Sequence, residues 1–73
     1  MKSLADLKVS EKGIISSFSD EQLSVKLIEM GCLPGSEVQV NFTAPFNGPI
    51  AIKVAGYHLS LRREEAKSIA LKE

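Results

Sequence analysis

The stretch Glu29-Met30-Gly31-Cys32-Leu33-Pro34-Gly35 combines a helix end with a turn that leads into a strand. Gly31 suits the left-handed position after a helix end, where a residue with a Cβ atom would be strained. Pro34 cannot continue a helix and biases the preceding residue, Leu33, toward extended backbone. The stretch therefore predicts a helix that ends near Met30, followed closely by a strand.

A helix-start pattern precedes this turn. In Ser19-Asp20-Glu21-Gln22, the Ser19 hydroxyl can accept from the third helical amide while Gln22 reaches back, which is a capping-box arrangement. We therefore predict an α-helix from about Asp20 to Met30. By their angles around the helix axis, its apolar residues fall into two sets. Leu23, Leu27 and Met30 form the predicted core face, and Val25 and Ile28 lie off it.

Alternating apolar and polar residues predict short strands on both sides of the helix. The alternation is most regular after the turn, where Val38, Val40 and Phe42 are predicted to face the core. The pair Asn47-Gly48, which favours positive φ angles, and the break at Gly56 predict two hairpins. The predicted strands comprise residues 13–18, 37–42, 50–55, 57–62 and 69–71.

This order of elements predicts a mainly β fold. Five short strands, with one helix inserted after the first, favour a small and strongly curved barrel, because a flat sheet of this size would leave its edges exposed. The segment from Arg63 to Ser68 predicts a second, short helix of about two turns. With 73 residues, the chain is expected to form a single domain over residues 1–73.

Composition limits the classes of partner. The nine basic and nine acidic side chains cancel, whereas nucleic-acid binders usually carry a clustered basic excess. Tyr57 and Phe42 are also predicted to face inward, which would leave no aromatic platform for bases. No run approaches the roughly 20 apolar residues that a membrane span needs. We expect no nucleic-acid partner and no direct membrane insertion, and the single cysteine, Cys32, is typical of a cytoplasmic chain.

No motif of catalysis or of cofactor binding is visible, so we predict neither an enzyme nor a bound cofactor. Cys32, His58 and Met30 are the residues that could bind a transition metal, but a structural zinc site usually needs four ligands. The preferred interpretation is therefore no metal site. In that case Cys32 packs as a small hydrophobic residue behind the helix end, and His58 faces solvent.

Leu33 is the main candidate for binding a partner. A large apolar side chain at the tip of a turn bounded by glycine and proline has few neighbours to cover it, and such residues often anchor partners. The alternative is a contact back onto the helix end, of the kind that accompanies helices terminated by glycine. Both interpretations remain open for Leu33, and equally for Val25, Ile28 and Phe46.

Three segments together carry a family resemblance. They are Met30-Gly31-Cys32-Leu33-Pro34-Gly35, Ala44-Pro45-Phe46-Asn47-Gly48-Pro49-Ile50 and Gly56-Tyr57-His58-Leu59-Ser60-Leu61-Arg62-Arg63-Glu64-Glu65-Ala66. In their order and spacing, they resemble the ferrous iron transport protein A family over nearly the whole chain. The resemblance implies an SH3-like barrel, in agreement with the fold predicted from the residues.

The resemblance also implies a function. It suggests a small cytoplasmic accessory of the bacterial ferrous iron permease, ferrous iron transport protein B, whose cytosolic region binds GTP. Such a protein would reach the inner membrane only through its partner, and it could activate, inhibit or assemble the transporter. Weak self-association through the apolar helix positions is a further expectation. The alternative is a metal-binding or metal-sensing domain like the C-terminal domain of iron-dependent repressors, with Cys32 and His58 as ligands.

Overall fold

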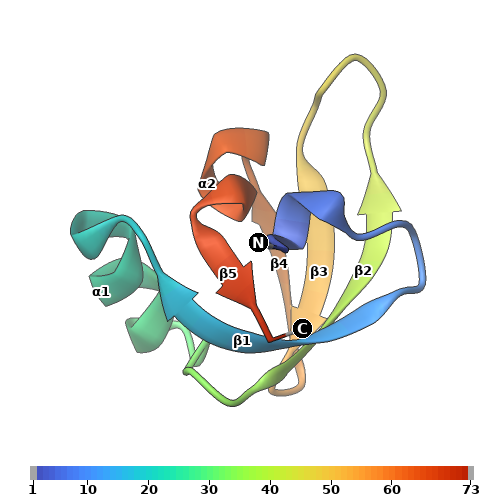
Figure 1. Cartoon of the computed structure of the whole chain (residues 1–73). Helices are drawn as coiled ribbons and strands as arrows, with labels where there is room; N and C mark the ends of the chain where they lie inside the picture. The colour runs from blue at the N-terminus through green and yellow to red at the C-terminus, as the bar shows by residue number, and fades with distance from the viewer. Residues whose placement is uncertain (1, 73) are drawn as a thin grey trace.

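The computed structural model describes residues 2–72 and arranges five strands in one antiparallel sheet, in the order β4-β3-β2-β1-β5. Figure 1 shows the sheet curving strongly, with α1 at the far end of β1. The mainly β class is confirmed, as are the helix inserted after the first strand and the second, short helix. The elements are η1 (Leu4–Asp6), β1 (Lys12–Phe18), α1 (Glu21–Glu29), β2 (Glu37–Thr43), β3 (Ile50–Val54), β4 (Tyr57–Leu61), α2 (Arg63–Lys67) and β5 (Ile69–Leu71).

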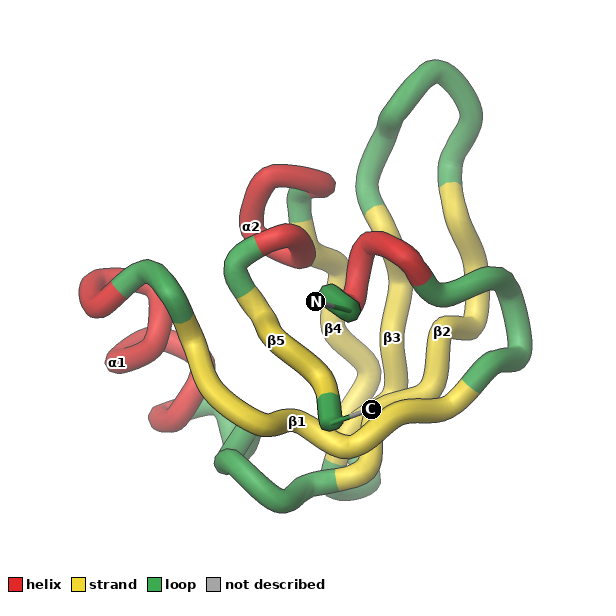
Figure 2. Tube along the Cα trace, viewed as in Figure 1, coloured by secondary structure: helices red, strands yellow, loops and turns green. Residues whose placement is uncertain are grey.

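One hydrophobic core lies inside the curve of the sheet. Figure 2 shows η1 and α2 beside each other over one side of this core, and α1 apart from them. Burial of these apolar side chains is the main favourable contribution to folding. Within residues 2–72, no helix is long and apolar enough to cross a membrane. The buried cluster comprises Leu4, Leu7, Ile15, Leu23, Leu27, Cys32, Val38, Val40, Ile50, Ile52, Val54, Leu61, Ala66, Ile69 and Leu71.

The start of α1 differs in detail from the predicted capping box. Asp20 is the N-cap, and its Oδ1 accepts from the backbone N–H groups of Gln22 at 3.0 Å and Leu23 at 3.1 Å. Ser19 instead donates its backbone N–H to the carbonyl of Ser68 at 2.8 Å. The hydrogen bond to Ser68, just before β5, holds Ser19 away from the helix. The carboxylate of Asp20 therefore accepts from the free amides of the first turn instead.

Two aromatic residues that were predicted to face inward are exposed. Val38 and Val40 are fully buried, but the β2–β3 register shifts between Val40 and Phe42, and Phe42 turns outward. A bulge of this kind breaks the alternation of faces along a strand. Tyr57 is exposed because it follows the two-residue turn Ala55-Gly56 at the end of the sheet. The prediction for both rings was wrong, so only the charge balance argues against nucleic-acid binding.

The hairpin between β2 and β3 also differs from the prediction. The positive φ angles fall on Phe46 and Asn47, both at 59°, and Gly48 N–H donates to the carbonyl of Pro45 at 3.1 Å. The turn is therefore centred one residue earlier than the Asn-Gly pair suggested. Gly48 is needed for a different reason, since a Cβ atom there would lie 2.7 Å from the Cβ of Ala44. Close approach of the two chain segments places the glycine just after the turn.

Candidate functional site

The turn after α1 is a Schellman motif built on Gly31. Met30 is the C-cap, Gly31 has a φ of 94°, and its N–H donates to the carbonyl of Ile28 at 3.0 Å. The N–H of Cys32 donates to the carbonyl of Leu27 at 2.8 Å. These two bonds satisfy carbonyls that a helix end would otherwise leave free. The side chains of Cys32 and Leu27 are both fully buried, so Cys32 is the apolar residue that closes this helix end.

The side chain of Leu33, unlike that of Cys32, is exposed. Its carbonyl accepts from Ser36 N–H at 3.0 Å across Pro34 and Gly35, and Gly35 has a φ of 93°. Proline followed by a residue of positive φ is the pattern of a type II turn. Gly35 N–H also donates to the carbonyl of Ile15 in β1 at 2.7 Å, which fixes the turn to the sheet. The Leu33 side chain remains 48% exposed at the tip of a well-anchored turn.

Two exposed apolar residues of α1 lie next to this turn. Val25 is 59% exposed and Ile28 is 44% exposed, whereas Leu23 and Leu27 of the same helix are buried. Residues three apart on a helix are neighbours on its surface, so Val25 and Ile28 form one short stripe. The stripe ends at the Schellman turn. Leu33 lies two residues after Gly31 in the sequence. Three of the four predicted binding residues therefore belong to one continuous part of the chain.

A groove of about 380 Å³ separates the end of α1 from β4. The two walls approach closely, because a Cβ atom on Gly31 would lie 3.8 Å from the ring of Tyr57 and 3.9 Å from the Cβ of Ala55. We call the groove together with Val25, Ile28 and Leu33 the helix-end surface. The groove is lined by Ile28, Glu29, Met30 and Gly31 on the helix side and by Tyr57, His58 and Leu59 on the strand side.

The sequence did not predict that β4 contributes to this surface. The sequence predicts that Tyr57 faces inward, and Leu59 lies within the predicted strand 57–62. The tight Ala55-Gly56 turn was the available signal, since residues at the end of a hairpin can extend beyond the core. Their closeness to the end of α1 depends on long-range packing, which local patterns do not report.

Phe46, the fourth predicted binding residue, lies elsewhere. It is 99% exposed at the tip of the loop between β2 and β3, and Figure 1 shows this loop at the opposite end of the molecule from α1. A bulky residue at positive φ is strained, and nothing covers its ring. Phe46 therefore cannot share one small contact area with Leu33.

The two candidate metal ligands differ in their surroundings. Cys32 is fully buried in the core, and this burial raises the pKa of its thiol, which disfavours the thiolate that binds metals. His58 is exposed on β4, and its Nδ1 lies 3.3 Å from Nδ2 of Asn41. Met30 and His58 line the groove together, but Cys32 does not. In residues 2–72, no group of three or more His, Cys, Asp or Glu side chains is placed to hold a metal ion.

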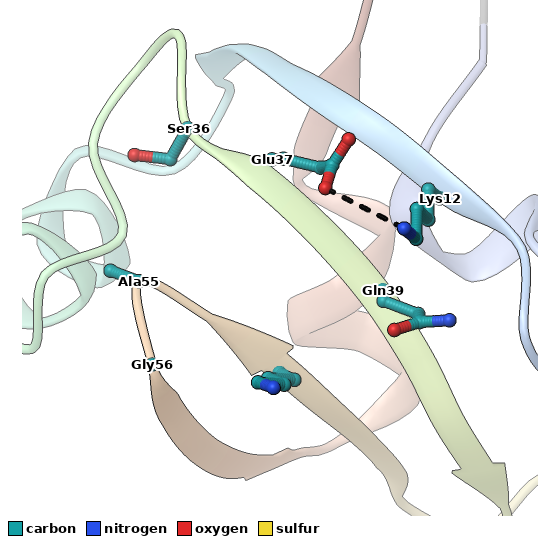
Figure 3. Close-up of a pocket in the computed structure, with 7 residues that line it drawn as sticks. Lys12, Ser36, Glu37, Gln39, Ala55 and Gly56 are labelled. Carbon is teal, nitrogen blue, oxygen red and sulfur yellow. Dashed lines mark ion pairs between the residues drawn. The ribbon is translucent and has the colours of Figure 1, made fainter.

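A second hollow, of about 430 Å³, lies on the outer face of the sheet (Figure 3). Lys12 Nζ and Glu37 Oε1 are 4.0 Å apart across it, and both side chains are more than half exposed. An exposed ion pair of this kind contributes little binding energy. The hollow therefore has the character of a solvent-facing sheet surface. It is lined by Lys12, Ser36, Glu37, Gln39, Lys53, Ala55 and Gly56.

Comparison with solved structures gives the same fold in several proteins. The FeoA protein from Chlorobium tepidum has a TM-score of 0.89 and 27% identity, with 96% of this chain and 68% of that chain covered. A FeoA-like protein from Clostridium acetobutylicum has a TM-score of 0.86 and 32% identity, with 96% and 83% covered. No curated protein matches the sequence.

A zinc complex of FeoA from Stenotrophomonas maltophilia has a TM-score of 0.86 and 23% identity, with 99% of this chain and 91% of that chain covered. That protein is described as a prokaryotic SH3 domain protein and is proposed as a ferrous iron transport activating factor. At this identity, the likeness establishes the SH3-like fold. The FeoA domain model itself matches residues 2–73 of the sequence. The chain therefore belongs to the FeoA family, which is associated with ferrous iron transport and is not a known family of enzymes.

Proposed function

We propose that this chain is a non-enzymatic accessory of ferrous iron uptake that binds the cytosolic region of the ferrous iron permease, ferrous iron transport protein B. In this proposal the chain acts as one cytoplasmic domain and reaches the inner membrane only through the permease. Its contacts alter the GTPase or the pore by favouring one conformation of the partner.

The observation that carries the proposal is the helix-end surface. Val25, Ile28 and Leu33 are each at least 44% exposed and lie within residues 25–33, and Ile28 also lines a groove whose walls include Met30 and Leu59. Apolar surface that is gathered in one place, rather than scattered, is typical of sites that bind other proteins. The fixed turn that presents Leu33 also limits the entropy that the side chain would lose on binding.

The remaining features favour binding over chemistry. A backbone hydrogen bond from Ser3 lowers the pKa of Asp6, and burial raises the pKa of the Cys32 thiol. Neither Asp6 nor Cys32 lines the groove, so neither of these shifted groups marks it as a catalytic site. The donor set around Cys32 and His58 likewise gives no support to a metal-sensing function.

The test compares Leu33→Glu with Phe46→Glu. Both changes place one carboxylate on an exposed apolar position, but at opposite ends of the molecule. Binding to the purified cytosolic region of the permease is measured by calorimetry, with GTP and with GDP. We expect Leu33→Glu to weaken binding roughly tenfold or more and Phe46→Glu to change it little.

Circular dichroism and thermal unfolding show whether each variant keeps the fold. Sedimentation of the chain alone, over a range of concentrations, shows whether the same apolar residues cause self-association. The docking surface is wrong if Leu33→Glu keeps a native spectrum and undiminished binding. The proposed function itself is wrong if the wild-type chain does not bind the permease region with either nucleotide.

A further inference from the structure

The two outer edges of the sheet are not equally protected. At β5, Leu71 N–H donates to the carbonyl of Lys2 at 2.8 Å, and Ser3 forms a bridge with Ala70, so the N-terminal segment covers this edge. At the other end of the sheet, β4 is paired only with β3 in the part of the chain that the structure describes. An unpaired strand edge presents N–H and C=O groups to any extended chain that can approach.

The hydrogen bonds of β2 show which groups of β4 point outward. Val40 N–H donates to the carbonyl of Glu11 at 3.1 Å, and its own carbonyl accepts from Ser10 at 2.7 Å, so Val40 bonds away from β3. Val40 is opposite Ile52, and Ile52 is opposite Leu59. Because bonding direction alternates along antiparallel strands, Ile52 and Leu59 bond to each other.

The same alternation fixes the neighbours of Leu59. His58 and Ser60, the residues on either side of it, direct their backbone N–H and C=O groups away from β3. Both residues are exposed. The open edge of β4 thus offers two donors and two acceptors in the spacing that a further strand would use.

This edge also lacks the usual protection against strand pairing. Proteins commonly block an exposed edge with lysine, proline or a bulge. Tyr57-His58-Leu59-Ser60-Leu61 contains neither lysine nor proline. The β3–β4 register runs without a shift from Ile50 opposite Leu61 to Val54 opposite Tyr57. Only the short length of β4 limits what it can pair with.

The groove determines what kind of chain fits here. Its strand wall is Tyr57, His58 and Leu59, and its other wall is the end of α1 with Ile28 and Met30. A single extended segment can lie between two such walls. The apolar residues of the two walls, which flank Glu29 and His58, favour alternate apolar side chains on the incoming segment.

We propose that β4 accepts an extended peptide segment as a sixth strand, held by the backbone groups of His58 and Ser60, with its alternate apolar side chains in the groove. This inference rests on the proposed function in placing that segment in the cytosolic region of the permease. It adds a mode of recognition, because main-chain bonds supply affinity and the groove supplies selectivity.

The first experiment follows amide hydrogen exchange by NMR while the cytosolic region of the permease is added. We expect exchange of the His58 and Ser60 amides to slow at least roughly tenfold at saturation, because both amides become hydrogen bonded. Docking through side chains alone would leave both amides exchanging at the rate of the free chain. Binding without such protection would overturn the proposal.

The second experiment uses Ser60→Pro with Ser60→Ala as its control. Ser60→Pro removes an N–H that no bond within the sheet uses, and proline is tolerated at such edge positions. Ser60→Ala removes the hydroxyl but keeps the N–H. We expect Ser60→Pro to weaken permease binding about tenfold and Ser60→Ala to leave it unchanged. Equal binding by a folded Ser60→Pro variant would contradict strand addition.

A peptide probe separates this inference from the proposed function. If the wild-type chain does not bind the permease region, the proposed function fails, and the edge is then tested with a synthetic octapeptide, acetyl-Lys-Thr-Val-Thr-Val-Thr-Val-Lys-amide. Saturable protection of the His58 and Ser60 amides by this peptide would support strand addition. Unchanged exchange at millimolar peptide would overturn it.

Discussion

The helix-end turn and the β2–β3 hairpin tip both contain left-handed backbone and both present a large apolar side chain, yet the two are built differently. At the helix end, the positive φ angles fall on Gly31 and Gly35, and Leu33 projects from between them. At the hairpin tip, Phe46 itself has a positive φ angle. The first turn is closed by the buried Cys32, whereas the Phe46 ring is 99% exposed.

This difference distinguishes an apolar surface on a fixed backbone from a single exposed residue. Leu33 follows the exposed apolar residues Val25 and Ile28 closely in the sequence, Ile28 lines the groove, and the Leu33 turn is bonded to β1. The β2–β3 loop that carries Phe46 lies at the opposite end of the molecule from α1 (Figure 1). Exposure alone therefore does not identify a binding residue. What matters is whether the backbone beneath the side chain is fixed and whether other apolar groups adjoin it.

The largest expected effect concerns the anchor of the helix-end turn. Leu27→Ala removes a fully buried side chain that closes this turn with Cys32, and should lower the free energy of unfolding by about 2–5 kcal/mol. Val25→Ala, on the exposed side of the same helix, should change it by less than about 0.5 kcal/mol. Urea unfolding followed by circular dichroism measures both. Similar losses in the two variants would mean that the turn is not anchored in the core.

Gly31→Ala tests the backbone of the same turn. A Cβ atom would meet only ordinary contacts at 3.8 Å, so the cost comes from the φ of 94° and should be about 1–2 kcal/mol. Gly35→Ala has open space around it and a φ of 93°, so its cost should be similar. Denaturant midpoints of the two variants provide the comparison. A negligible loss in both would show that the left-handed positions are not needed.

Phe46→Gly should stabilise the fold, whereas the variants above destabilise it. Glycine relieves the strain at a φ of 59°, and the exposed ring contributes little packing, so stability should rise. The gain should be roughly 0.5–1 kcal/mol, because glycine also loses more backbone entropy on folding. Thermal unfolding measures it, with Pro45→Gly as a control at the preceding residue. A loss of stability would mean that the ring makes a contact that matters for the fold.

The smallest expected effect is the pH dependence from Cys32. Burial raises the pKa of this thiol above its ordinary value of 9.0, so the folded chain holds the proton longer than the unfolded chain. The resulting stabilisation is complete below pH 9.0 and is lost as pH rises through the folded-state pKa. Between pH 9 and 10, urea unfolding should show stability falling more steeply for the wild-type chain than for Cys32→Ala. If stability fell equally with pH in the wild-type chain and in Cys32→Ala, the effect could not be assigned to Cys32.

The sequence was most informative where the determinants are local. Gly31 and Pro34 fixed the end of α1, and the Val38 and Val40 alternation identified the core face of β2. The outward turn of Phe42 could not be predicted, because it depends on a register shift against β3. Cys32 is the fully buried apolar residue at the helix end and Leu33 is 48% exposed, and partner binding by Leu33 stays a prediction. The distance of Phe46 from this surface follows from the curvature of the sheet, which no local pattern encodes.

Mapping amide chemical shifts by NMR tests the central claim most directly. The labelled chain is titrated with the cytosolic region of the permease, and the shift of each backbone amide is recorded. We predict that the largest changes fall on residues 25–33 and 57–60, with little change over residues 44–49. Saturable shifts centred on residues 44–49, with residues 25–33 and 57–60 unaffected, would contradict the account.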